Sequence, residues 1–168
     1  RSIHIADEAA AGSDLLGTAR VLAAALKRES FDLILLGQQA ADSECYVMAG
    51  LVAELLEVPC VTQAASIELA DGSVTVKRQV ETGYDTVKAQ LPCVVSVSDA
   101  INDPRYPPLP AIMGAKRKPH EVVTLAELGI DLTRRASQQH EIVAGTEAGM
   151  AEQCIGAFTT ALFKTGLK

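Results

Sequence analysis

The chain lacks a long hydrophobic run, and it lacks an excess of positive charge. No apolar stretch approaches the roughly 20 residues that span a bilayer, so we expect no membrane insertion. The formal net charge is −6 at pH 7, which disfavours a nucleic-acid partner because phosphate binding relies on basic side chains. No signal-peptide pattern opens the chain, since His4 and Asp7 closely follow Ile3. With 168 residues, 48% of them hydrophobic, the sequence predicts one globular core.

Paired cysteines and clustered histidines are also missing. Four cysteines lie far apart, each among apolar residues, and form no C-x-x-C pair; this pattern predicts reduced, buried thiols and neither a metal site nor a disulfide. The three histidines are scattered through segments of unlike character, and we find no acid, base and nucleophile set. The sequence therefore predicts no catalytic residue. The cysteines are Cys45, Cys60, Cys93 and Cys154, and the histidines are His4, His120 and His140.

A buried strand followed by a glycine and a polar loop is the most informative stretch. Leu33–Leu36 are four consecutive aliphatic residues, as in a strand buried on both faces, and Gly37 ends them. An apolar pattern at helical spacing follows from Tyr46 to Leu56. A ligand binds at the carboxyl end of such a strand in many α/β proteins. We expect a bound phosphate to meet backbone N–H groups between Gln39 and Ser43 at the start of the next helix; the alternative is a plain sharp turn.

The first third of the chain reads as alternating strands and helices. Strands are expected at Ile3–Ile5, Leu33–Leu36 and Cys60–Thr62. A helix from Asp14 to Glu29, with Ser13 as its N-cap, and the helix ending near Glu57 connect them. Such β-α-β-α-β crossovers imply a parallel sheet with right-handed connections.

The pattern then changes to alternating apolar and polar residues. From Ser66 to Gln90, two hairpins are expected, turning at Asp71-Gly72 and at Thr82-Gly83. These strands have one wet face and predict an antiparallel extension of the sheet. A buried strand, Cys93–Val97, follows Pro92. The predicted fold class is α/β, a Rossmann-like, mostly parallel sheet with an antiparallel hairpin extension.

A proline-rich segment follows Ser98. Prolines exclude it from the centre of a sheet, and it joins an apolar stretch, Leu109–Ala115, to the basic Lys116-Arg117-Lys118. Exposed apolar residues beside charge suggest a partner surface, whereas folding back into the core is the alternative. Thr124 and Glu127 form a capping-box pattern that opens a short helix.

The end of the chain is expected to be an arm and a helix. Residues 133–149 are polar and low in periodicity, as in an extended arm. A last helix is expected from Met150 to Thr165. We therefore divide the chain into a domain at residues 1–132 and an arm with a helix at 133–168.

The order of motifs resembles the β subunit of electron transfer flavoprotein over about residues 14 to 135. A proline-arginine-tyrosine run followed by leucine-proline-x-isoleucine-methionine is the most specific of them. The motifs are Leu35-Leu36-Gly37-x-Gln39-Ala40-x-Asp42, Leu55-x-x-x-Pro59, Leu91-Pro92-x-Val94-Val95, Asn102-x-Pro104-Arg105-Tyr106-x-x-Leu109-Pro110-x-Ile112-Met113-x-Ala115-Lys116 and Leu125-x-x-Leu128-Gly129-Ile130.

The resemblance implies an electron carrier and not an enzyme. Such a β subunit pairs with an α subunit that holds most of the FAD contacts, and the heterodimer takes electrons from flavin dehydrogenases, such as acyl-CoA dehydrogenases, and passes them on. Its fold is that of the adenine nucleotide α hydrolases, and the arm and last helix of this chain are expected to contact the partner subunit. AMP, or a second FAD in bifurcating members, occupies the β subunit's own site. The resemblance assigns nucleotide contacts to Gly37, Gln38, Gln39, Ala40, Ala41, Asp42, Ser43, Glu44 and Cys45, and dehydrogenase contacts to Tyr106, Leu109, Pro110, Ile112, Met113 and Lys116.

Two departures from the family pattern stand out. Tyr46, Val47, Met48 and Ala49 replace mostly smaller or polar residues, and Tyr46 could stack on a ring. Family members begin well before Arg1, so we expect the chain to lack roughly the first third. A regulatory nucleotide-binding domain is the main alternative function. An adenylating hydrolase is disfavoured, because no Ser-Gly-Gly-x-Asp-Ser-like loop occurs. The expected location is the cytoplasm, with the mitochondrial matrix as the alternative.

Overall fold

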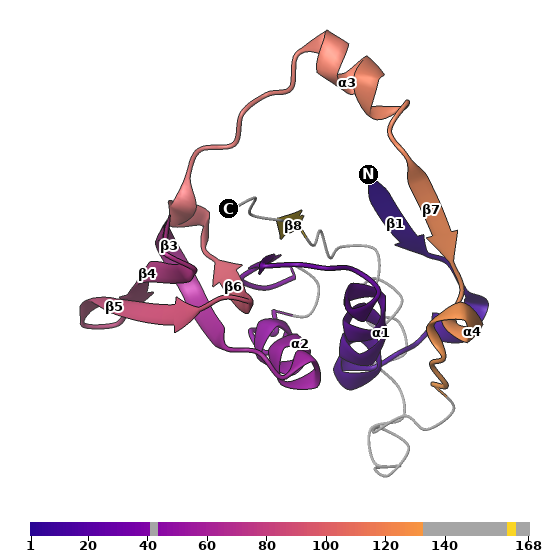
Figure 1. Ribbon diagram of the computed structural model, residues 1–168, viewed down its shortest axis with the longest axis horizontal. Helices are drawn as coiled ribbons and strands as arrows, with labels where there is room; N and C mark the ends of the chain where they lie inside the picture. Colours follow the sequence, from indigo (N-terminus) through magenta and orange to yellow (C-terminus); the bar gives the residue numbers. More distant parts are fainter. Residues whose placement is uncertain (41–43, 133–160, 164–168) are drawn as a thin grey trace.

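The computed structural model describes residues 1–40 and 44–132 and the backbone of residues 161–163. They form an α/β structure with a mixed, open six-stranded sheet and a separate two-stranded sheet (Figure 1). This architecture is consistent with a Rossmann-like fold. The elements are β1 (Ser2–Ile5), η1 (Glu8–Ala10), α1 (Leu15–Lys27), β2 (Leu33–Gly37), α2 (Met48–Leu56), β3 (Cys60–Ala70), β4 (Ser73–Val80), β5 (Gly83–Gln90), β6 (Cys93–Val97), η2 (Asp99–Ile101), α3 (Leu109–Ala115), β7 (His120–Val123), α4 (Leu125–Leu128) and β8 (Ala161–Phe163).

The centre of the large sheet is parallel. Its strand order is β5-β4-β3-β6-β2-β8, and β6 pairs in parallel with both β2 and β3. The aliphatic run Leu33–Leu36 of β2 and the apolar run Cys93–Val95 of β6 suit strands that are covered on both faces. Helices α1 and α2 cover one face together (Figure 1). The strands predicted at Leu33–Leu36 and Cys93–Val97 are therefore confirmed.

Alternate residues of these strands supply two cores. Ile34 and Val94 face α1 and α2, where they pack with Ala19 and Val52. Leu33 and the side chains beside it face the other way, into a second cluster. Because successive strand residues point to opposite faces, one continuous apolar run can build both clusters. The second cluster contains Leu33, Val61, Ala64, Val74, Val76, Cys93 and Val95.

The antiparallel extension forms as expected, with two differences. β3 and β4 turn at Asp71 and Gly72, whose φ angles are 50° and 69°; these are the positive values of a type I′ hairpin turn. β4 and β5 pair antiparallel up to Val80 and Gly83, so their turn lies at Glu81-Thr82, one residue before the predicted Thr82-Gly83. The separate strands expected before and after Ala64 are instead one strand, β3, because an irregularity near Gln63 (φ 60°) bends it without ending it.

The first strand, β1, lies outside the large sheet, and the prediction of a mostly parallel sheet is wrong. β1 pairs in parallel with β7 in a sheet of their own, with Ser2 opposite His120 and Ile5 opposite Val123. The six-stranded sheet has two parallel pairs and three antiparallel ones, and is therefore mixed. β1 alternates exposed and partly buried residues, which suits a strand that is covered on one face only.

Helix α1 begins one residue later than expected. Asp14, and not Ser13, is the N-cap, because its carboxylate accepts a hydrogen bond from the Gly17 N–H at 2.7 Å. The Ser13 hydroxyl is buried and donates to the Ala10 carbonyl at 2.7 Å. This bond joins η1 to the start of α1 and leaves the serine unavailable as a cap.

The end of the described chain differs from the expected helix over 150–165. Residues 161–163 form β8, which pairs antiparallel with β2, with Ala161 opposite Leu35. A free edge of β2 would expose unpaired backbone groups, and β8 satisfies them. The helix prediction is therefore wrong for 161–163. The predicted arm at 133–149 and the remainder of the predicted helix lie outside the described residues, so contact with a partner subunit stays a prediction.

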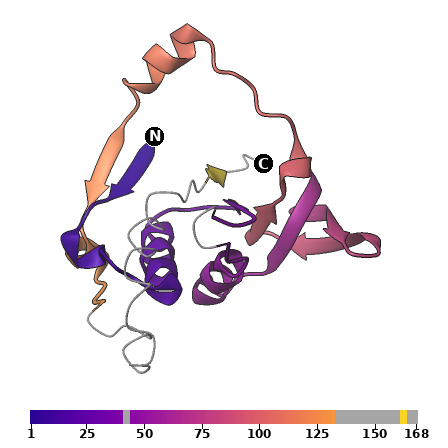
Figure 2. The same cartoon turned by 180° about the vertical axis from the view of Figure 1, so that it is seen from behind.

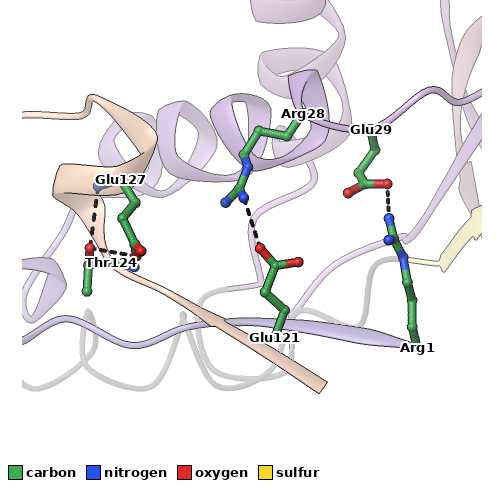
Figure 3. A network of polar contacts seen from close by, with 6 residues as sticks. All are labelled: Arg1, Arg28, Glu29, Glu121, Thr124 and Glu127. Atoms are coloured by element: carbon green, nitrogen blue, oxygen red, sulfur yellow. Dashed lines mark hydrogen bonds and ion pairs between the residues drawn. The ribbon is translucent and has the colours of Figure 1, made fainter. Parts of the chain in front are cut away.

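The two-stranded sheet is tied to α1 by ion pairs and to α4 by a helix cap (Figure 3). Arg28 pairs with Glu121 at 2.9 Å, and Arg1 pairs with Glu29. The Thr124 N–H donates to the Glu127 carboxylate at 2.7 Å, and the Thr124 hydroxyl caps the helix in return. Two hydrogen bonds lower the pKa of Glu127: the bond from the Thr124 N–H has the larger effect, and the bond from the Thr124 hydroxyl has the smaller one. The predicted capping box and the αL residue Gly129 at the helix end are confirmed.

Candidate functional site

The polar loop lies where the sequence places it, at the carboxyl edge of the parallel strands. Gly37, the last residue of β2, is opposite Val97, the last residue of β6. Both strands point the same way, so their carboxyl ends meet at one edge of the sheet. The loop that follows leads into α2, which packs on the sheet beside α1. A ligand at this edge would meet the loop first.

The described loop residues differ in exposure. Gly37, Gln39 and Glu44 are exposed, Gln38 and Cys45 are half-buried, and Ala40 is buried. Ala41, Asp42 and Ser43 lie outside the described residues. Of the four residues that depart from the family pattern, Tyr46 and Val47 are about half exposed, whereas Met48 and Ala49 are buried. Among the described residues from Gly37 to Cys45, Ala40 is the buried one.

The start of α2 corrects one expectation. The helix begins at Met48, and no side chain caps its N-terminus at Val47. The helix therefore starts later in the sequence than the stretch from Gln39 to Ser43. The backbone N–H groups that a helix start offers to a ligand are those in the first turn of α2.

Two glycines at this edge have no internal reason to be glycine. A methyl group added to Gly37 would meet only the Gln39 carbonyl at 4.0 Å, and one added to Gly50 in α2 would meet nothing within 4 Å. Neither residue has a positive φ angle. Glycine without a steric or conformational requirement is what a close-approaching ligand selects. Sequence reasoning did not single out Gly50, although glycine inside a helical pattern is the signal that could have done so.

Two serines near the same edge are used internally. The Ser96 hydroxyl accepts the Gln63 N–H at 3.1 Å, and the Ser98 hydroxyl donates to the Ala64 carbonyl at 3.2 Å. Both serines are buried. They hold the irregular part of β3 against β6, so the polar groups offered to a ligand come from the loop and from α2.

The proline-rich segment forms an exposed helix. Its apolar part is α3, Leu109–Ala115, which buries none of its residues. Pro108 precedes the helix and Pro110 lies in its first turn, where a missing N–H breaks no helical bond. The structure therefore replaces the expected loop by a helix and contradicts the alternative that Leu109 folds back into the core.

The whole segment around α3 is exposed. Every residue from Asn102 to Val122 is exposed, and Figures 1 and 2 both show α3 at the far end of an arch that leaves the sheet after η2 and returns at β7. Five of the nine large hydrophobic residues exposed in the described chain lie here. They are Tyr106 at 98% exposure, Leu109 at 70%, Val122 at 56%, Met113 at 54% and Ile112 at 46%.

We call Tyr106, Leu109, Ile112 and Met113 the α3 apolar surface. Lys116, Arg117 and Lys118 follow it directly and are exposed. Residues 102–108 also border a hollow of about 520 Å³, but a single exposed segment forms its whole lining and cannot enclose a ligand. The segment therefore suits a contact surface and not a small-molecule site.

The cysteines differ from one another more than expected. Cys93 is fully buried, as predicted, and desolvation raises the pKa of its thiol to about 11. Cys60 is exposed at the start of β3, and Cys45 is half-buried. The prediction of uniform burial is wrong for these two, because they stand at the ends of elements and not inside them. None of these three described cysteines forms a disulfide, and Cys154 lies outside the described residues.

Within residues 1–40 and 44–132, no three metal-ligating side chains gather into a cluster. None of the helices there is both long and apolar enough to cross a membrane. His4 and His120, far apart in the sequence, do lie side by side, with ring centres 5.8 Å apart; sequence reasoning missed this pair because only the pairing of β1 with β7 creates it.

Comparison with known proteins gives a consistent result. The model of the electron transfer flavoprotein domain matches residues 1–128. Electron transfer flavoprotein subunit beta of Bos taurus is 40% identical over 139 residues, 82% of this chain and 54% of the relative. The corresponding subunit of Homo sapiens is 39% identical with the same coverage. That of Mycobacterium leprae (strain TN) is 37% identical over 133 residues, 79% of this chain and 50% of the relative.

The chain thus spans about half the length of the curated relatives it matches. The matched part includes the β2 loop and α3, the two regions whose geometry is described above. On the family match and on these identities, the chain belongs to the electron transfer flavoprotein family and is a relative of its β subunits.

Proposed function

We propose that this chain works as a β subunit of electron transfer flavoprotein, in a heterodimer with an FAD-holding α subunit. It would pass electrons from a flavin dehydrogenase, such as an acyl-CoA dehydrogenase, to a downstream acceptor. The relatives are named as electron transfer subunits, which is consistent with a carrier and not an enzyme. We expect the cytoplasm as its location, with the mitochondrial matrix as the alternative, since relatives occur in bacteria and in mammals.

The observation that carries this proposal is the α3 apolar surface. An apolar side chain at the centre of an interface contributes most when it is exposed in the free protein and buried in the complex. Leu109 meets the first condition, at 70% exposure. The prolines on both sides of it restrict the backbone, which lowers the entropy lost on docking. A regulatory nucleotide-binding domain has no evident use for such a surface.

The test is Leu109→Ala in the heterodimer, with Leu69→Ala as the matched control. Leu69 is another exposed leucine, at 45% exposure near the β3–β4 turn. Burial of one leucine is worth about 1.5–3 kcal/mol, so Leu109→Ala should raise the Kd for the dehydrogenase about tenfold or more. Leu69→Ala should leave that Kd unchanged. Equal effects of the two variants, or none from Leu109→Ala, would contradict the docking role.

Basic residues beside α3 are proposed to steer the dehydrogenase. Lys116, Arg117 and Lys118 are exposed, and clustered exposed charge raises association rates toward an acidic partner. Replacing all three with Gln should lower the association rate at low salt more than at high salt, because salt screens the attraction. A salt-independent rate in the parent protein would argue against steering.

Pairing with the α subunit is proposed from the family, in which this chain's relatives are named as subunits. Co-expression of the two subunits should give one peak in size-exclusion chromatography, with flavin absorbance in that peak. Two separate peaks at micromolar concentration would count against the heterodimer. This outcome is distinct from the Leu109→Ala result, which concerns the dehydrogenase.

The loop from Gly37 to Cys45 is proposed to contact a nucleotide, either AMP or a second FAD. Its position at the carboxyl edge of β2 and β6 and the unexplained glycines Gly37 and Gly50 support this. Gly37→Ala should leave the melting temperature nearly unchanged, because a methyl group fits there without a clash. It should nevertheless lower nucleotide occupancy, measured by mass spectrometry of the denatured supernatant. A parent protein that releases no nucleotide would remove this site.

A further inference from the structure

The two-stranded sheet carries a pair of histidines on its exposed face. His4 lies on β1 and His120 on β7, and both are exposed. Their ring centres are 5.8 Å apart, with the ring planes tilted by 35°. The parallel pairing of the strands holds the two backbones in fixed register, with Ser2 opposite His120 and His4 opposite Val122. The rings are therefore brought together by backbone hydrogen bonds and not by chance contact of mobile side chains.

This separation is close to the span of two imidazoles on one metal ion. A Zn–N bond is about 2.0–2.1 Å, and the tetrahedral angle that Zn²⁺ prefers places two ligating rings with their centres about 5 Å apart. The observed 5.8 Å exceeds this by less than about 1 Å. Side-chain torsions of two exposed histidines would close that difference on metal binding, without a change in strand pairing.

Ser2 supplies the outer partner that metal-binding histidines usually have. Its hydroxyl is 2.8 Å from Nδ1 of His120. When Nδ1 carries the proton and donates it to that hydroxyl, Nε2 keeps its lone pair for a metal. The acidic Glu121 and the basic Arg28 pair with each other, and Figure 3 shows Glu121 and Arg1 directed toward the end of α1. These ion pairs leave the imidazoles as the metal-binding groups of the outer face.

We propose that His4 and His120 form a two-histidine site for a borderline divalent cation, with Zn²⁺ as the chemical type. Imidazole nitrogen suits this class of ion, and water would complete the coordination. The bound ion would join β1 to β7 at the point where the exposed 102–122 segment returns to the body of the protein. The proposal is independent of the electron-transfer role.

The test titrates the protein with ZnCl₂ by isothermal calorimetry, without a polyhistidine tag, so that no added histidine supplies ligands. One Zn²⁺ per chain is expected, together with a melting temperature that rises with metal concentration because the ion binds the folded state. His4→Gln and His120→Gln should each weaken binding at least tenfold. Ser2→Ala should weaken it about tenfold, the effect typical of losing an outer-shell partner.

Two matched controls keep the result interpretable. His140→Gln removes the third histidine of the chain, and Ser66→Ala removes an exposed strand serine from the other sheet; neither should change the affinity. Absence of saturable binding would overturn the proposal and leave the two rings as an aromatic contact. An equal loss of affinity in His140→Gln would also overturn it, because the site would then not consist of the His4 and His120 pair.

Discussion

The centre of the large sheet and the segment from Asn102 to Val122 use similar residues in opposite ways. In β2 and β6, Ile34 and Val94 are completely buried, under α1 and α2. In the segment, Leu109 and Ile112 are exposed although they are equally apolar. A central strand is hydrogen-bonded to a neighbouring strand along each edge and is covered on both faces. The short, proline-flanked α3 has no layer that covers it.

The difference teaches that apolar composition does not by itself place a residue in a core. Burial follows from whether a backbone can enter a sheet or a helix layer, and the prolines keep residues 104–108 out of a sheet. Exposed apolar residues on such a segment are then available for a partner. The two regions should therefore respond differently to mutation and to pH.

The largest expected effect compares Ile34→Ala with Leu109→Ala. Ile34 is fully buried between β2 and the helices, so its truncation should cost about 2–5 kcal/mol of unfolding free energy. Leu109 is 70% exposed, and its truncation should change that free energy by less than about 0.5 kcal/mol. Urea denaturation followed by circular dichroism measures both. Similar losses from the two variants would show that Leu109 belongs to a core after all.

The second prediction concerns pH and the buried thiol of Cys93. Desolvation raises its pKa in the folded protein from the ordinary 9.0 to about 11. Above pH 9 the unfolded chain therefore loses this proton first, so stability falls as the pH rises from about 9 to about 11. A two-unit difference corresponds to about 2–3 kcal/mol.

Urea midpoints measured between pH 8 and 11 test this effect. Cys93→Ala should lose stability overall but should have a shallower decline in this range, since it has no thiol at position 93. Cys60→Ala is not a neutral control, because the charge of Cys60 contributes to the raised pKa of Cys93, so Cys45→Ala, outside the strands, serves as the control. An unchanged slope in Cys93→Ala would contradict the assignment.

The smallest expected effect concerns the anchored end of the exposed segment. Thr124→Ala removes the cap of α4 and should cost about 1 kcal/mol. The backbone N–H of Thr124, and then its hydroxyl, lower the pKa of Glu127. Alanine keeps the backbone N–H, so only the bond from the hydroxyl to the carboxylate is lost in the variant. The stabilisation by that bond is present above the ordinary carboxyl pKa and is lost as the pH falls through the lowered pKa. The difference between the parent and the variant should therefore shrink in acid without vanishing, because the bond from the Glu127 N–H to the Thr124 hydroxyl remains in the parent. Thr82→Ala, in the β4–β5 turn, is the control and should show no such pH dependence.

Much of this molecule is determined by local sequence. The aliphatic runs of β2 and β6, the Asp71-Gly72 turn and the Thr124–Glu127 capping box predicted their structures correctly. In each case a few adjacent residues set the outcome, through two-sided burial, a positive φ angle or a helix cap. The exposure of the proline-rich segment was an open alternative in the sequence, and the structure decided it.

Position within the sheet and long-range pairs are decided by tertiary structure alone. The sequence shows that Ser2–Ile5 is extended, but only the encounter with His120–Val123 sets its partner and brings His4 beside His120. In the same way, residues 161–163 take the extended form because the free edge of β2 offers hydrogen-bonding groups, which outweighs a local helical pattern. Local propensities are small and act over a few neighbouring residues. The β1–β7 and β2–β8 pairs join backbone groups more than a hundred residues apart, and these groups meet only in the folded chain.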